Sequence, residues 1–134
     1  LVFGAIDDAV VPYTDQQAGF DKGPAPKRLI GLAKAGHLAF TDICIMAKED
    51  GGLLGVAKKY DVALPKSFDA FIDKLATDGC KEGQLPYEEG AVIVDFATAA
   101  AFEERLHCRT TASAALKGIS ERFSAVGEYK EALE

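Results

Sequence analysis

The chain has 134 residues, of which 49% are hydrophobic and 27% charged, with a formal net charge of -6. This length is enough for one domain with a core of its own and too short for two. An acidic chain does not neutralise phosphates, so we expect no nucleic-acid partner. No apolar run approaches the roughly 20 residues of a membrane-spanning helix, so we expect no membrane span.

The N-terminal part predicts two short strands and a helix between them. Residues 1–4 are an apolar run bounded by glycine and acidic residues, which is typical of a buried strand. A helix is predicted to start at Thr14, because Thr14 and Gln17 have the spacing of a capping box. Residues 19–26 are rich in glycine and proline and predict a loop. Residues 27–32 form the second predicted strand.

A second helix is predicted over residues 38–47, before the sequence Gly51-Gly52 interrupts the pattern. The order strand, helix, strand, helix is typical of a parallel sheet, so the fold class is predicted to be α/β. In such sheets ligands bind beyond the carboxyl ends of the strands.

The remainder of the chain predicts helices only. Ser67 is placed to cap a helix that Gly79 ends, with Phe68, Phe71, Ile72 and Leu75 on one face. Residues 92–106 are apolar on all sides and predict a helix that is buried nearly all round. A last helix would carry Leu116, Ile119, Phe123 and Val126 on one face. We therefore expect a segment over residues 1–47 with about two parallel strands, and a helical extension over residues 48–134, within one domain.

The three cysteines, Cys44, Cys80 and Cys108, include no Cys-x-x-Cys pair and lack the close spacing of a zinc site, so no metal is predicted. One disulfide and one free thiol would fit a secreted or periplasmic protein, and Cys80 with Cys108 is then the expected pair. Three buried thiols would fit a cytoplasmic protein. The sequence leaves both alternatives open.

Two titratable residues follow the predicted strands. Asp8 lies in the pattern Gly-x-x-x-Asp-x-x-x-Pro, and His37 lies in Gly-His-Leu-x-Phe, 29 residues after Asp8. Each has an ordinary alternative role, Asp8 as a turn acid and His37 as a loop histidine. Their neighbour Asp7 is expected to be solvated or to lie at a helix end.

These two patterns resemble the acid and histidine segments of α/β-hydrolases. Within that superfamily they are similar to dienelactone hydrolases, to bacterial cutinases and polyester hydrolases, and to esterases like platelet-activating-factor acetylhydrolase. The resemblance covers residues 1–44, about a third of the chain. It implies the C-terminal part of an α/β-hydrolase fold, with Asp8, four residues before Pro12, as the triad acid and His37 as the base.

The nucleophile that this family requires is missing from the chain, which has no Gly-x-Ser-x-Gly. Its four serines, Ser67, Ser113, Ser120 and Ser124, all lie in helical patterns. Since the family order is nucleophile, acid, histidine, we expect the serine upstream of Leu1. Leu1 itself already belongs to a strand pattern, so we expect this chain to be a C-terminal fragment of a longer polypeptide, with the oxyanion-hole amides also outside it.

The resemblance implies a serine hydrolase of carboxylic esters, small or polymeric, that works through an acyl-serine intermediate without metal or organic cofactor. Tyr13 and Phe40 would line an acyl pocket or pack in the core, and His107 would have a structural role. The fragment alone is expected to be inactive and to pair with the missing N-terminal half or with itself. The alternatives are a peptidase of the prolyl-oligopeptidase type and a non-catalytic binding or structural module derived from a hydrolase.

Overall fold

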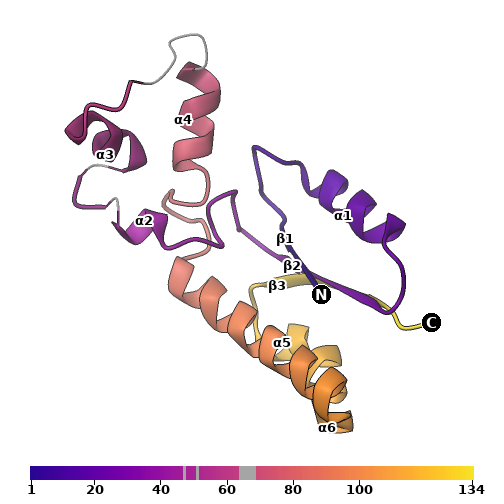
Figure 1. Ribbon diagram of the computed structural model, residues 1–134. Helices are drawn as coiled ribbons and strands as arrows, with labels where there is room; N and C mark the ends of the chain where they lie inside the picture. Colours follow the sequence, from indigo (N-terminus) through magenta and orange to yellow (C-terminus); the bar gives the residue numbers. More distant parts are fainter. Residues whose placement is uncertain (47, 51, 64–68) are drawn as a thin grey trace.

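A computed structural model describes residues 1–46, 48–50, 52–63 and 69–134 (Figure 1). In chain order the elements are β1 (Val2–Ala5), α1 (Tyr13–Lys22), β2 (Lys27–Leu32), α2 (Ile43–Met46), α3 (Leu53–Lys59), α4 (Asp69–Thr77), α5 (Tyr87–His107), α6 (Thr110–Lys117), α7 (Ile119–Arg122) and β3 (Val126–Ala132).

The strands form one mixed sheet in the order β1-β2-β3. β1 and β2 run parallel, with Val2 opposite Leu29, and β3 runs antiparallel to β2, with Tyr129 opposite Ile30. β2 is the central strand, and its residues from Arg28 to Leu32 are all buried. The sheet therefore has one parallel pair, whose two carboxyl ends lie at the same edge.

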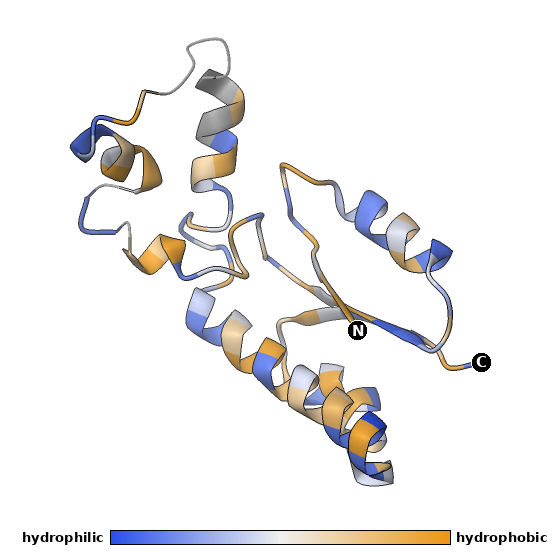
Figure 2. Ribbon diagram, in the orientation of Figure 1, coloured by the Kyte–Doolittle hydropathy of each residue, from blue (hydrophilic) through white to orange (hydrophobic). Residues whose placement is uncertain are grey.

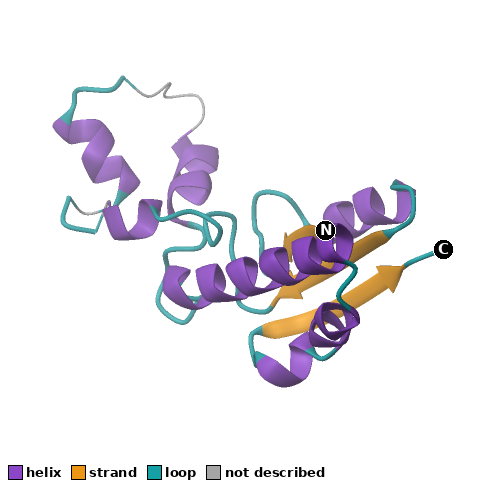
Figure 3. Cartoon of the chain, turned by 60° about the horizontal axis from the view of Figure 1, so that its bottom comes forward, coloured by secondary structure: helices purple, strands orange, loops and turns teal. Residues whose placement is uncertain are grey.

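Helices cover both faces of the sheet. On one face lies α1, and on the other lie α5 and α6 (Figures 1 and 3). The Tyr13 ring of α1 lies against Gly31 of β2 so closely that a Cβ at Gly31 would overlap the ring. The opposite face of β2 presents Ile30 and Leu32 to a core formed with Ile93, Ala97, Leu116 and Ile119. The layers are thus helix, sheet, helix.

The expectation of a purely helical C-terminal part is wrong at β3. Val126, expected on the last helix, begins this strand, and the residues before it form the two short helices α6 and α7. Arg28 of β2, only 4% exposed, contributes to the pairing through hydrogen bonds to Tyr129 Oη (3.0 Å) and Glu131 Oε2 (3.3 Å) of β3. Pairing with a buried strand overrides the weak helical pattern here.

The prediction that residues 92–106 are buried nearly all round is also wrong. α5 buries Ile93 and Ala97, yet Val92, Phe102 and Leu106 are 57%, 59% and 71% exposed. Figure 2 shows hydrophobic residues interleaved with hydrophilic ones along this helix. Only one face of α5 packs on the sheet, so the apolar residues on its far side remain accessible.

The helix expected over residues 38–47 is much shorter, because α2 comprises only Ile43–Met46. The chain just after His37 forms turns instead, in which the N–H of Leu38 donates to the carbonyl of Asp78 (2.8 Å). Thr14 is not the N-cap of α1, which begins at Tyr13 directly after Pro12.

The capping role expected of Ser67, and the face expected to include Phe68, lie outside the described residues. The helix predicted there is α4, and Gly79 follows it in the left-handed conformation (φ 105°) that favours glycine. α3 and α4 lie away from the sheet (Figure 1). In the described ranges we find no helix with the length and apolarity to cross a membrane.

Candidate active site

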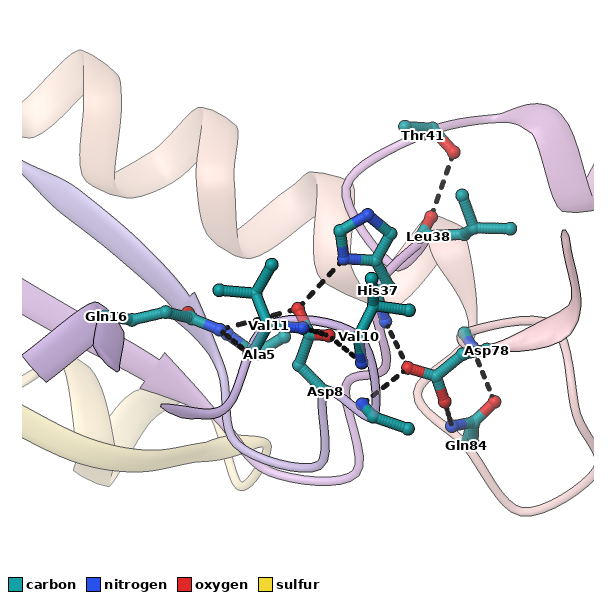
Figure 4. A network of polar contacts seen from close by, with 12 residues as sticks. Ala5, Asp8, Val10, Val11, Gln16, His37, Leu38, Thr41, Asp78 and Gln84 are labelled. Atoms are coloured by element: carbon teal, nitrogen blue, oxygen red, sulfur yellow. Dashed lines mark hydrogen bonds and ion pairs between the residues drawn. The ribbon is translucent and has the colours of Figure 1, made fainter. Parts of the chain in front are cut away.

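Asp8 and His37 lie together beyond the carboxyl ends of β1 and β2. His37 Nδ1 is 3.1 Å from Asp8 Oδ2, a hydrogen-bonding distance (Figure 4). The Asp8 side chain is 6% exposed and that of His37 is 28% exposed. Adjacent parallel strands end at one edge of the sheet, which explains how residues 29 positions apart in the sequence meet.

The acid loop, residues 6–12 between β1 and α1, is shaped by Asp8 itself. Its Oδ1 accepts hydrogen bonds from the backbone N–H groups of Val10 (2.8 Å) and Val11 (2.7 Å), which closes a turn around the carboxylate. Gln16 of α1 supports the same loop, since its Nε2 donates to the carbonyl of Val11 (2.9 Å) and its Oε1 accepts from the N–H of Ala5 (3.0 Å). Oδ2 of Asp8 is thereby directed at the imidazole.

The histidine loop, residues 33–42 between β2 and α2, depends on a residue that the sequence patterns did not indicate. Asp78, which directly follows α4, is 2% exposed, and its Oδ2 accepts from the backbone N–H groups of His37 (2.8 Å) and Ala9 (2.9 Å). Burial by itself would raise the pKa of Asp78, but these hydrogen bonds and one from Gln84 outweigh it, so the pKa lies below its ordinary value. In the sequence, Asp78 is recognisable as an acidic residue just before a glycine at the end of a predicted helix. Most acidic residues at such positions cap the helix or face solvent, so this pattern does not identify a buried residue.

Asp7 differs clearly from its neighbour. Its side chain is exposed, and its backbone N–H donates to the carbonyl of Ala35 (3.0 Å), which ties the acid loop to the chain after β2. Asp8 is thus the acid that the structure brings to His37.

The arrangement gives His37 the geometry of a general base. With Nδ1 bonded to a carboxylate, the proton of the neutral ring is held on Nδ1, and Nε2 has a free lone pair. Figure 4 shows Nε2 pointing away from Asp8. A carboxylate so placed also stabilises the imidazolium that forms when Nε2 takes a proton.

No serine of the described part of the chain hydrogen-bonds to His37. Ser113 lies in α6 and Ser120 in α7, as the helical patterns predict, whereas Ser124 lies in the turn before β3. Ser67 lies outside the described residues. Among the described residues, Asp8 and His37 therefore form a hydrogen-bonded pair to which no serine is bonded.

The two aromatic residues considered for an acyl pocket have different environments. Tyr13 packs between α1 and the sheet and donates its hydroxyl hydrogen bond to Glu128 Oε2 of β3 (2.6 Å). Burial and this hydrogen bond raise the pKa of Tyr13 above its ordinary value. Phe40, three residues after His37, is 39% exposed and its ring centroid is 6.4 Å from that of Phe3.

The expected disulfide between Cys80 and Cys108 is wrong. The disulfide joins Cys44 of α2 to Cys80, and Cys108 is a free, exposed thiol in a left-handed conformation at the end of α5. The long helix α5 separates Cys80 from Cys108 along the chain, whereas the turns after His37 bring Cys44 to the end of α4. The disulfide therefore joins the segments that carry His37 and Asp78.

Removing this disulfide is expected to weaken the fold next to the site. The double variant Cys44→Ser, Cys80→Ser should lower the free energy of unfolding by about 2–4 kcal/mol, because a constraint on the unfolded chain is lost. Urea denaturation followed by circular dichroism measures this change. Cys108→Ser is the matched control, and the prediction fails if both variants unfold at the wild-type midpoint.

His107 lies away from the dyad, with Nδ1 3.1 Å from Glu103 Oε2 on the exposed surface of α5. Across the described ranges, no three histidine, cysteine, aspartate or glutamate side chains gather as they would around a metal ion. Comparison with protein-family models, with curated proteins and with solved structures finds no match for this chain.

Proposed function

We propose that this chain supplies the acid and the base of a serine hydrolase that cleaves carboxylic esters. The observation that carries the proposal is the hydrogen bond of 3.1 Å between His37 Nδ1 and Asp8 Oδ2, at the carboxyl ends of two adjacent parallel strands. In this role His37 Nε2 takes the proton of a serine hydroxyl and then passes it to the leaving alcohol, while Asp8 stabilises the imidazolium.

The nucleophile would come from a segment outside this chain that pairs with β1. β1 is an edge strand of the sheet, and an edge strand offers backbone groups on its outer side to a further strand, although the N–H of Ala5 already donates to Gln16 Oε1. A parallel strand added there would end at the same edge of the sheet as β1 and β2. The turn after that strand would then bring its first residues close to His37, which is where a serine nucleophile is needed.

Exposed apolar side chains beside this edge support the same idea. Leu1 and Val2 are 45% and 38% exposed, and Phe102 and Leu106 of α5 are more exposed still. Leu1, Phe102 and Leu106 line one open groove together with Phe3. Covering these residues with the additional segment would bury apolar surface at about 25 cal/mol per Å². We therefore favour that segment, in place of a second copy of this chain, as the partner.

The proposal is tested by assaying the chain with and without its partner segment. The purified chain of 134 residues should not hydrolyse p-nitrophenyl acetate above the rate of free imidazole. The complete enzyme should hydrolyse it and should be inactivated by a serine-directed phosphonate. Ester turnover by the isolated chain that survives the phosphonate would contradict the mechanism.

A further inference from the structure

Asp78 contacts both loops of the dyad with one oxygen atom. Oδ2 accepts from the N–H of Ala9, which follows Asp8, and from the N–H of His37. The carbonyl of Asp78 also accepts from the N–H of Leu38 (2.8 Å), on the other side of the histidine. Figure 4 shows the carboxylate between the two loops. A single buried side chain thus binds the backbone of both loops, next to Asp8 in one and at His37 in the other.

Gln84 fixes the orientation of this carboxylate. Its Nε2 donates to Asp78 Oδ1 (3.0 Å), and its Oε1 accepts from the N–H groups of Gly79 (2.7 Å) and Lys81 (3.0 Å). Every polar atom of the two side chains therefore has a defined role as donor or acceptor. The amide cannot turn over without placing donors against donors.

The packing around Asp78 leaves no room for adjustment. A Cβ added at Gly36 would lie 2.8 Å from Asp78 Oδ1 and 2.6 Å from Gln84 Nε2, so only glycine fits directly before His37. The disulfide between Cys44 and Cys80 joins the turn after Asp78 to α2, which follows the histidine loop. The histidine loop is therefore held both before His37, at Gly36, and after it, by the disulfide of Cys44.

We propose that Asp78 is a positioning residue, which sets the hydrogen bond between Asp8 and His37 by holding both loops through one carboxylate oxygen. The turn made by Asp8 shapes the acid loop alone and does not reach His37 by backbone bonds. Without Asp78, two backbone bonds in the described part of the chain would join the acid loop to the chain before His37, from the N–H of Ile6 to the carbonyl of Leu32 and from the N–H of Asp7 to the carbonyl of Ala35, and neither reaches His37 itself. The catalytic consequence of this inference rests on the proposed function, but the geometry of the dyad does not.

The test exchanges the carboxylate of Asp78 and the amide of Gln84 between the two positions. Asp78→Asn places an amide NH₂ against that of Gln84 or against the two backbone N–H groups, so at least one hydrogen bond is lost. In the double variant Asp78→Asn, Gln84→Glu, the new amide donates to the new carboxylate, whose second oxygen still accepts from Gly79 and Lys81. All contacts are then restored at unchanged net charge.

Nitrogen-15 NMR of the imidazoles reads the dyad directly in this chain, which has only two histidines. His107→Gln assigns the signals. In the wild type, and in the double variant, neutral His37 should carry its proton on Nδ1. In Asp78→Asn the signal should move to a mixture of tautomers. In the complete enzyme the single variant should lose about 100-fold in kcat with KM changed less than about twofold, and the double variant should recover most of the loss.

The inference is overturned if Asp78→Asn opens the amide protons of Ala9 and His37 to hydrogen exchange and still keeps the wild-type tautomer, or if the double variant folds without restoring that tautomer. If the single variant does not fold, the inference is tested by comparing hydrogen exchange in the double variant and the wild type. The amide protons of Ala9 and His37 must then be protected from hydrogen exchange in both, and exchange at the rate of open loops would also overturn the inference. A wild-type enzyme without esterase activity would contradict the proposed function, and the tautomer would still decide the role of Asp78.

Discussion

Replacing His37 with glutamine is expected to lower kcat/KM for ester hydrolysis by the complete enzyme by about 10⁴-fold or more. In the proposed mechanism His37 Nε2, which faces away from Asp8, accepts the proton of the serine and passes it on. A glutamine at this position can form a hydrogen bond but cannot act as a base. Steady-state hydrolysis of p-nitrophenyl esters measures the loss, and a melting curve establishes that the variant is folded.

His107→Gln is the matched control for this variant. His107 is exposed and contacts Glu103, so its replacement should leave both rate and stability close to the wild type. A His37→Gln enzyme that is folded and retains more than about a tenth of the activity would exclude His37 as the base.

Replacing Asp8 with asparagine is expected to lower kcat by about 10⁴-fold while the fold is maintained. The amide oxygen can still accept from the N–H groups of Val10 and Val11, so the turn is preserved. The amide nitrogen would then face His37 Nδ1, which must become the acceptor. The ring proton moves to Nε2, where it blocks proton abstraction from a serine.

Asp7→Asn controls for the change of charge, because Asp7 is exposed and, within the described ranges, is joined to the histidine side through its backbone N–H and not through its side chain. The control should keep full activity. Equal losses in the Asp7 and Asp8 variants would indicate a general electrostatic effect and would contradict a specific role for Asp8. The same NMR measurement that reports on Asp78 should show the Nε2–H form of His37 in Asp8→Asn.

The two loops differ in how far along the chain their stabilising hydrogen bonds reach. Asp8 organises its own turn with bonds to residues two and three positions ahead, and such local bonds depend little on the rest of the fold. The histidine loop has one local side-chain bond, from the Thr41 hydroxyl to the carbonyl of Leu38 (3.0 Å), but the N–H of His37 itself is bonded by Asp78, which lies 41 positions later. Mutations in the second half of the chain can therefore affect the site without touching either titratable residue.

Local patterns in the sequence predicted the two strands β1 and β2 that precede the site, but not the turns that replace the helix expected over residues 38–47. β2 covers residues 27–32 as predicted, with the apolar residues Leu29, Ile30 and Leu32 in a short segment that follows Pro26. The resemblance selected Asp8 over Asp7 and paired it with His37, and the structure brings these two residues together. The roles of acid and base remain predictions that the variants above test.

Tertiary structure alone decided the remaining features, because they depend on contacts between distant segments. β3 forms where the sequence shows no alternation, since pairing with buried β2 outweighs local preference. Cys44 and not Cys108 reaches Cys80, because the turns after His37 return the chain to the end of α4. Asp78 is buried where two loops from the first third of the chain and the side chain of Gln84 place N–H groups around its carboxylate. Composition and residue spacing do not predict such contacts between segments that are far apart in the sequence.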